Sequence, residues 1–223
     1  MYLAASEAFS AGLIAIGRFG DPNIPIDKVL AAYLEKVPSV AQVMVTANER
    51  TVRAVVEFAG ELNAAHVRLA GKRAPLDFHK LQLEALMEHV KTVSRACDQI
   101  LEDMKQHNLD HADASDQRRW AVLQASFEFQ QSQGAEANAR AEEMRNALFP
   151  KQLAYAEETV GEVARLGRRL AVVTLSIRSE LGLSIDEAEY KRIVDEAMAK
   201  QEAVVRQLTE EVRTFLGSMP SPG

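Results

Sequence analysis

The stretch HKLQLEALMEHVKTVSRACDQILEDMKQH, residues 79–107, decides the fold class of this chain. Its apolar and histidine side chains recur at alternating intervals of four and three residues, at His79, Leu83, Leu86, Val90, Val93, Cys97, Ile100, Met104 and His107. This alternation is typical of an α-helix that packs lengthwise against another helix. Because Pro75 is well placed in the first turn of a helix, the pattern predicts a helix from Pro75 to His107.

Four other segments repeat this rhythm and predict further long helices, and two shorter amphipathic segments precede them. The long segments are residues 40–70, about 120–148, about 151–181 and 187–216. The short segments are residues 2–19 and 26–37. In the last helix the expected contact seam is Tyr190, Ile193, Ala197, Val204, Leu208, Val212 and Phe215.

Glycines and prolines mark the expected helix ends. Gly71 and Gly182 are predicted left-handed caps after two of the long helices, and Pro38 is expected to end the second short one. Pro150 is either a boundary or a kink within a continuing helix. Capping-box pairs are expected at Ser39 with Gln42 and at Ser184 with Glu187.

These segments predict an all-α fold: an elongated antiparallel bundle of about five long helices with two short N-terminal helices. The expected organisation is an N-terminal short-helix segment (1–38), a long-helix bundle (39–217) and a disordered tail (218–223). The seam is thin at QQSQGAEANARAEE, residues 130–143, where side chains are small or polar. Either a neighbouring helix comes very close there, or the helix bends or breaks near Gly134.

Composition limits the classes of partner. Hydrophobic residues make up 47% of the chain and charged residues 26%, which is typical of a folded globular protein. The formal net charge of −6 argues against a nucleic-acid partner, because binding of phosphate needs a concentrated basic surface. Cys97 is the single cysteine, which favours a reducing compartment, and we expect the cytoplasm. No stretch approaches the roughly 20 apolar residues needed to cross a bilayer.

The stretch RLGRRLAVVTLSIRSELGL, residues 165–183, contains the longest apolar run of the chain. Projected on a helix, this run is apolar nearly all round, so it is expected to be touched on several sides. One interpretation places it centrally among neighbouring helices. The other leaves Val172 and Leu175 exposed, and then Leu170, Val172 and Leu175 form a surface for self-association or for a partner.

Candidate chemical groups are few. His107 and His111, with Asp110 and Asp113, have the residue types of a zinc site, although a polar link between helices contains such residues anyway. His66, His79 and Cys97 occupy seam positions and are expected to be core residues. There is no Glu-x-x-His of a di-iron bundle and no common metalloprotease or nucleotide-binding motif. We therefore expect no enzyme, no cofactor and no metal.

Two further patterns leave alternatives open. Arg165, Arg168, Arg169 and Arg178 form a basic cluster, which is either a solvated face with helical salt bridges or a site for an anionic surface. The small and polar seam residues Gln130, Gly134, Gly167 and Thr174 either permit close helix contact or leave a cavity for a small ligand.

These observations favour a non-enzymatic scaffold or adaptor that acts by helix packing, with itself or with another helical protein. Alternatives are a ligand-sensing bundle and an amphipathic coat on a lipid or granule surface. The alanine-rich amphipathic pattern of residues 40–106, including PLDFHKLQLEAL (residues 75–86), resembles that of phasins, the granule-coating proteins of polyester-storing bacteria. The resemblance covers less than half of the chain and implies binding to an apolar surface.

Overall fold

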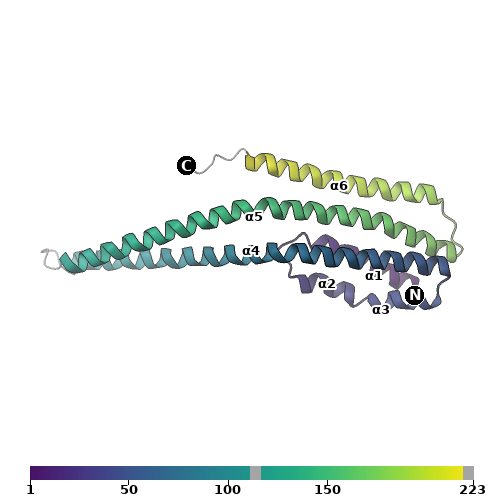
Figure 1. Cartoon of the computed structure of the whole chain (residues 1–223), viewed down its shortest axis with the longest axis horizontal. Helices are drawn as coiled ribbons and strands as arrows, with labels where there is room; N and C mark the ends of the chain where they lie inside the picture. Colours follow the sequence, from purple (N-terminus) through teal and green to yellow (C-terminus); the bar gives the residue numbers. More distant parts are fainter. Residues whose placement is uncertain (111–116, 218–223) are drawn as a thin grey trace. The chain divides into compact units, whose positions relative to one another are not determined.

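The computed structural model describes residues 1–110 and 117–217, which form six α-helices and no strand (Figure 1). The helices are α1 (Tyr2–Arg18), α2 (Ile26–Leu34), α3 (Val37–Thr46), α4 (Glu49–Asp110), α5 (Gln117–Glu180) and α6 (Glu187–Gly217). The all-α expectation is confirmed. The division into helices differs, because three helices are long rather than five.

Helices α4 and α5 run through the positions where boundaries were expected. They contain 62 and 64 residues, with Pro75 inside α4 and Pro150 inside α5. The predicted cap at Gly71 and the predicted helix start at Pro75 are therefore wrong, and the continuing helix is the correct alternative at Pro150. A single glycine or proline lowers helix stability locally, but helical sequence with a packed seam continues on both sides of each one.

Side-chain contacts also relocate several helix ends. Pro38 lies in the first turn of α3 instead of ending a helix, and the Ser39 hydroxyl donates to the Ala4 carbonyl at 3.0 Å, so no capping box forms there. The amides of Ala188 and Glu189 donate to Asp186 at 2.9 and 3.0 Å, so Asp186, not Ser184, caps the start of α6. Gly182 has a φ of 68°, which confirms the left-handed cap predicted after α5.

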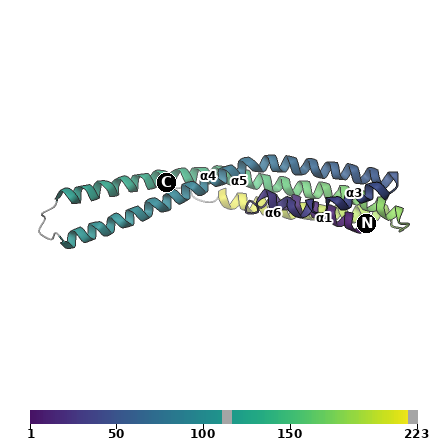
Figure 2. The same ribbon diagram turned by 90° about the horizontal axis from the view of Figure 1, so that it is seen from below.

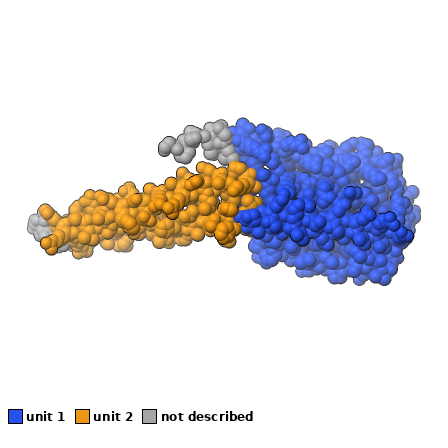
Figure 3. All heavy atoms as spheres, in the orientation of Figure 1, with its two compact units in different colours: residues 1–75, 152–223 blue, residues 76–151 orange. Residues whose placement is uncertain are grey.

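The chain divides into two compact units (Figure 3). Unit 1 comprises residues 1–75 and 152–223, and unit 2 comprises residues 76–151. The limits between the units follow Pro75 and Lys151. The expected division into a short-helix segment, 1–38, and a long-helix bundle, 39–217, stays a prediction. The expected tail, 218–223, lies outside the described residues.

Unit 1 has its core between the N-terminal helices and the adjoining parts of α4 and α5. Phe9 of α1 and Phe58 of α4 are buried, with their rings edge-on at 4.9 Å. The Tyr155 hydroxyl of α5 donates to the Leu69 carbonyl of α4 at 3.0 Å. The buried Arg73 donates to the carbonyls of Phe19 and Ile24, which lie in the connection after α1. Arg73, which lies between the predicted cap at Gly71 and the predicted helix start at Pro75, thus fixes the connection onto α4.

Unit 2 is an antiparallel hairpin of α4 and α5 (Figure 2). All nine seam positions predicted in residues 79–107 are buried or half-buried, whereas most positions between them are exposed. A Cβ atom on Gly134 would lie 3.2 Å from Val93, and the helix continues through Gly134. The thin seam therefore serves close helix contact, and the alternative of a break near Gly134 is wrong. Across residues 1–110 and 117–217, no helix combines the length and apolar character needed to cross a bilayer.

Candidate functional site

Helix α6 packs against α5 through one of its two apolar faces. Val194, Met198, Val205 and Val212 are half-buried on this face. A Cβ atom on Gly167 of α5 would lie 2.6 Å from the Met198 sulfur, so the absence of a side chain at Gly167 makes room for Met198. The close contact predicted at this glycine is therefore confirmed.

Charged pairs fix the flank of this contact. Arg168 of α5 contacts Glu202 of α6 at 3.0 Å and Asp195 at 3.5 Å, while Arg213 of α6 contacts Glu157 of α5 at 2.8 Å. The hydrogen bond from Arg168 holds the pKa of Glu202 below its ordinary value. The α5–α6 contact thus combines a packed apolar face with an ion-pair flank.

The second apolar face of α6 is exposed. Its large side chains are Ile193, Val204, Leu208 and Phe215, each between 52% and 62% exposed, and Ala197 lies among them. We call Ile193, Ala197, Val204, Leu208 and Phe215 the α6 stripe. These five residues belong to the seam predicted for the last helix. The other two residues of that seam, Tyr190 and Val212, are half-buried. The predicted seam is therefore turned mostly to solvent.

The two faces share an origin in the sequence. Ile193 precedes Val194, Ala197 precedes Met198, and Val204 precedes Val205, and consecutive helix residues point about 100° apart. Together these pairs make an apolar surface around the helix that is wide enough to contact two neighbouring helices. Within its own unit, α6 uses one half of that arc against α5.

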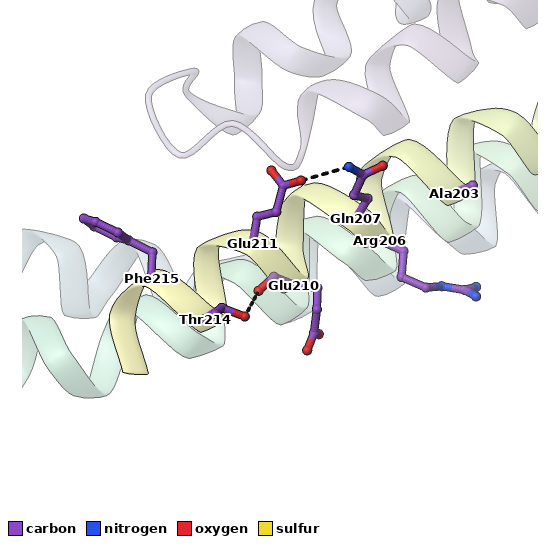
Figure 4. A pocket seen from close by; sticks show the side chains of 7 residues that line it. All are labelled: Ala203, Arg206, Gln207, Glu210, Glu211, Thr214 and Phe215. Carbon is purple, nitrogen blue, oxygen red and sulfur yellow. Dashed lines mark hydrogen bonds between the residues drawn. The ribbon is translucent and has the colours of Figure 1, made fainter. Parts of the chain in front are cut away.

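A shallow hollow lies on α6, and Phe215 of the α6 stripe is one of the residues that line it (Figure 4). The residues that line it are Ala203, Arg206, Gln207, Glu210, Glu211, Thr214 and Phe215. The Gln207 amide donates to the Glu211 carboxylate at 2.9 Å, while the Phe215 ring projects away from the helix (Figure 4). Because all the described lining residues belong to one helix, this surface suits a docking helix better than an enclosed ligand.

The candidate partner residues in α5 have different surroundings. Leu175 is 3% exposed, and its neighbours Val173 and Ile177 are also buried, so the apolar run is mainly a core segment. Val172 is 44% exposed and Leu170 is half-buried. Binding of a partner by Leu170, Val172 and Leu175 stays a prediction, with Val172 the most accessible of the three.

The arginines of the predicted basic cluster pair with acidic residues of neighbouring helices. Arg165 contacts Glu61 of α4 and Glu162 of its own helix, and Arg169 contacts Glu61 at 3.2 Å. Arg168 belongs to the ion pairs with α6, and Arg178 is half-buried. Pairing between helices therefore accounts for three of the four cations.

Only part of the predicted metal-ligating set lies in the described residues. His111 and Asp113 lie outside the described residues, whereas His107 is buried and stacks on Trp120 with ring centroids 6.0 Å apart. No group of three metal-ligating side chains gathers in residues 1–110 and 117–217. Cys97 is half-buried on the seam of unit 2, as its position predicts.

His66 is a core residue, as predicted. It is buried on α4, stacked on Tyr33 of α2 at a centroid distance of 5.1 Å, and neither ring nitrogen has a hydrogen-bond partner of good geometry. Burial lowers the pKa of His66, although the Leu62 carbonyl favours the protonated ring. His66 thus joins the N-terminal helices to α4.

The small and polar seam residues that were considered for a ligand cavity belong to different units. Gln130 and Gly134 belong to unit 2, whereas Thr174 belongs to unit 1 and donates its hydroxyl hydrogen to the Leu170 carbonyl at 3.0 Å.

Comparison with known proteins yields no matching family, no matching curated protein and no matching solved structure.

Proposed function

We propose that this chain is a non-enzymatic scaffold or adaptor that acts through helix packing, with the α6 stripe as its docking surface. The observation that carries the proposal is the second apolar face of α6, whose four large side chains stay more than half exposed. Isolated exposed apolar residues are common, but a row along one helix face is typical of an interaction surface. The proposed location is the cytoplasm, from the single cysteine.

The strength of such docking can be bounded. Burying the exposed part of each large side chain would contribute roughly 1 kcal/mol, or about 4 kcal/mol for the four. Association itself costs about 4 kcal/mol or more in lost freedom of motion. The α6 stripe alone therefore does no more than offset this cost, so net binding requires further contacts from the partner, including contacts to Lys200 and Glu211, which interrupt the row of apolar residues.

Photocrosslinking in the cells that produce the chain tests this proposal. A photoreactive amino acid replaces Val204 in the full chain, and Val67 serves as the control site because it is an exposed valine of α4 away from the stripe, 75% exposed. We expect a discrete adduct from position 204 and none from position 67. The same weak, diffuse background at both positions would contradict the proposal.

A coat on an apolar surface is the second candidate function, because the segment that resembles phasins exposes two large side chains one turn apart. Phe78 and Leu81 both lie on the surface of unit 2. A coat protein would float with lipid droplets, and replacing both residues with glutamate would release it, whereas Val204→Glu would not. Failure of the wild-type chain to float with droplets would contradict this function.

A further inference from the structure

The α6 stripe and the two charged residues that lie on the same face of the helix form one row whose spacing is the same in both directions. Together with the two charged residues that interrupt it, the row is Ile193, Ala197, Lys200, Val204, Leu208, Glu211 and Phe215. The intervals between successive members are four, three, four, four, three and four residues. The row is therefore symmetric about Val204, where a two-fold axis relating two such helices would pass.

We propose that α6 of a second copy of this chain occupies the α6 stripe, antiparallel, with the two-fold axis at Val204. This inference rests on the proposed function and names the partner. In this arrangement residues equidistant from Val204 face one another. Ile193 then packs against Phe215 of the second copy, and Val204 packs against its own counterpart.

The charges of the row select the antiparallel direction. Lys200 then lies opposite Leu208 of the second copy and about one turn from its Glu211, which gives an attractive pair on each side of the axis. A parallel pair would instead place Lys200 beside Lys200 and Glu211 beside Glu211. Like charges held together in an apolar seam oppose that pairing.

The length of the row sets the size of the contact, and the two-fold symmetry closes it. From Ile193 to Phe215 the helix rises about 33 Å, at 1.5 Å per residue. A two-fold contact uses the same surface on both copies, so both stripes are covered and no stripe is left to extend the assembly. With a helix about 10 Å wide, the contact is smaller than the roughly 800 Å² per partner of a standard interface. We therefore expect a dimer that forms reversibly and depends on concentration.

Disulfide crosslinking of the purified full chain tests the register. In a Cys97→Ser background, single cysteines are placed at Ile193, Val204, Phe215 and the control site Val67, all of which are exposed. We expect Val204→Cys to form a disulfide-linked dimer at least tenfold faster than Val67→Cys. A mixture of Ile193→Cys and Phe215→Cys should crosslink to each other, and neither should crosslink to itself. Far-UV circular dichroism melts check that each variant folds.

The other outcomes overturn the inference in distinguishable ways. Self-crosslinking of Ile193→Cys and of Phe215→Cys would indicate a parallel pair. Crosslinking no faster than at Val67 would exclude pairing through α6. If Val204 nevertheless captures a different protein in the cellular photocrosslinking experiment, the proposed function stands and the second copy is wrong. If neither experiment yields an adduct, both proposals fall.

Discussion

Two glycines in the helices of unit 1 have opposite surroundings. A Cβ atom on Gly12 of α1 would lie 2.6 Å from a methyl group of Leu62 and 3.1 Å from the Tyr33 ring, and both of these side chains are buried. A Cβ atom on Gly60 of α4 would meet nothing within 4 Å. Gly12 therefore permits the close approach of α1 to α4, whereas Gly60 has no such role.

We predict that alanine has opposite effects at these two positions. Gly12→Ala should lower the free energy of unfolding by about 1–3 kcal/mol, because the packed neighbours cannot move away. Gly60→Ala should raise it by up to about 1 kcal/mol, because alanine has the higher helix propensity. Urea denaturation measures both free energies of unfolding, and a Gly12→Ala variant that is as stable as the wild-type chain would refute the packing described for α1.

The buried His66 should make the free energy of unfolding depend on pH. Because burial lowers its pKa in the folded chain from the ordinary 6.5, the unfolded chain takes up a proton at a higher pH than the folded chain does. The contribution of His66 to stability is therefore complete above about pH 6.5. It decreases as the pH falls below this value and levels off below the lowered pKa.

Thermal melts between pH 5 and 8 check this prediction. His66→Phe, which keeps a ring against Tyr33, should remove the part of the pH dependence between the folded and unfolded pKa values of His66. An unchanged pH profile in this variant would show that His66 is not a buried neutral group.

The seam position of His66 predicted its burial, but not its stacking on Tyr33. The periodicity of one helix does not specify which side chains of another helix reach it.

At the scale of elements, helical periodicity predicts seams better than it predicts ends. The seam of residues 79–107 is confirmed position by position, because repeated burial of one face imposes the same spacing on the sequence. The ends at Gly71 and Pro75 were wrong, since local breaking signals are weak against a packed seam on both sides. The cap at Asp186 was not predicted, because the side chain of Ser184, two residues earlier, can also accept hydrogen bonds from the free amides of a helix start.

Pro150 offers a test of helix continuity. Inside a helix, proline lacks the amide that would donate to the Asn146 carbonyl, and interior proline costs about 3 kcal/mol relative to alanine. Pro150→Ala should therefore raise the free energy of unfolding by about 1–3 kcal/mol and increase hydrogen-exchange protection around residues 150–154. No change in either quantity would indicate that the helix ends before Pro150, as the alternative sequence prediction has it.

At the scale of the whole molecule, the sequence predicts which residues share a face but not how many neighbours cover that face. The residues of the α6 stripe were predicted as one seam, and they do lie on one face. Their exposure could not be predicted, because the adjacent residues Val194, Met198 and Val205 supply a second face, and that face packs on α5. The run near Val172 gave the opposite result, since most of its side chains are buried.

The division into two units could not be predicted from the helical periodicity either, because α4 and α5 run through both units without interruption. Only the positions of Pro75 and Pro150 in the sequence mark the limits. For the whole molecule we infer that the exposed face of α6 binds a second copy of the chain and is not merely a solvated face.

Multi-angle light scattering over a concentration series is the decisive measurement of this self-association, with the wild-type chain beside Val204→Glu and the matched control Val67→Glu. We predict that the wild-type chain and Val67→Glu approach the mass of two chains as concentration rises. Val204→Glu, which would bring two carboxylates together at the axis, should stay at the mass of one chain, with association weakened at least tenfold. One mass for all three proteins, independent of concentration, would rule out self-association through α6.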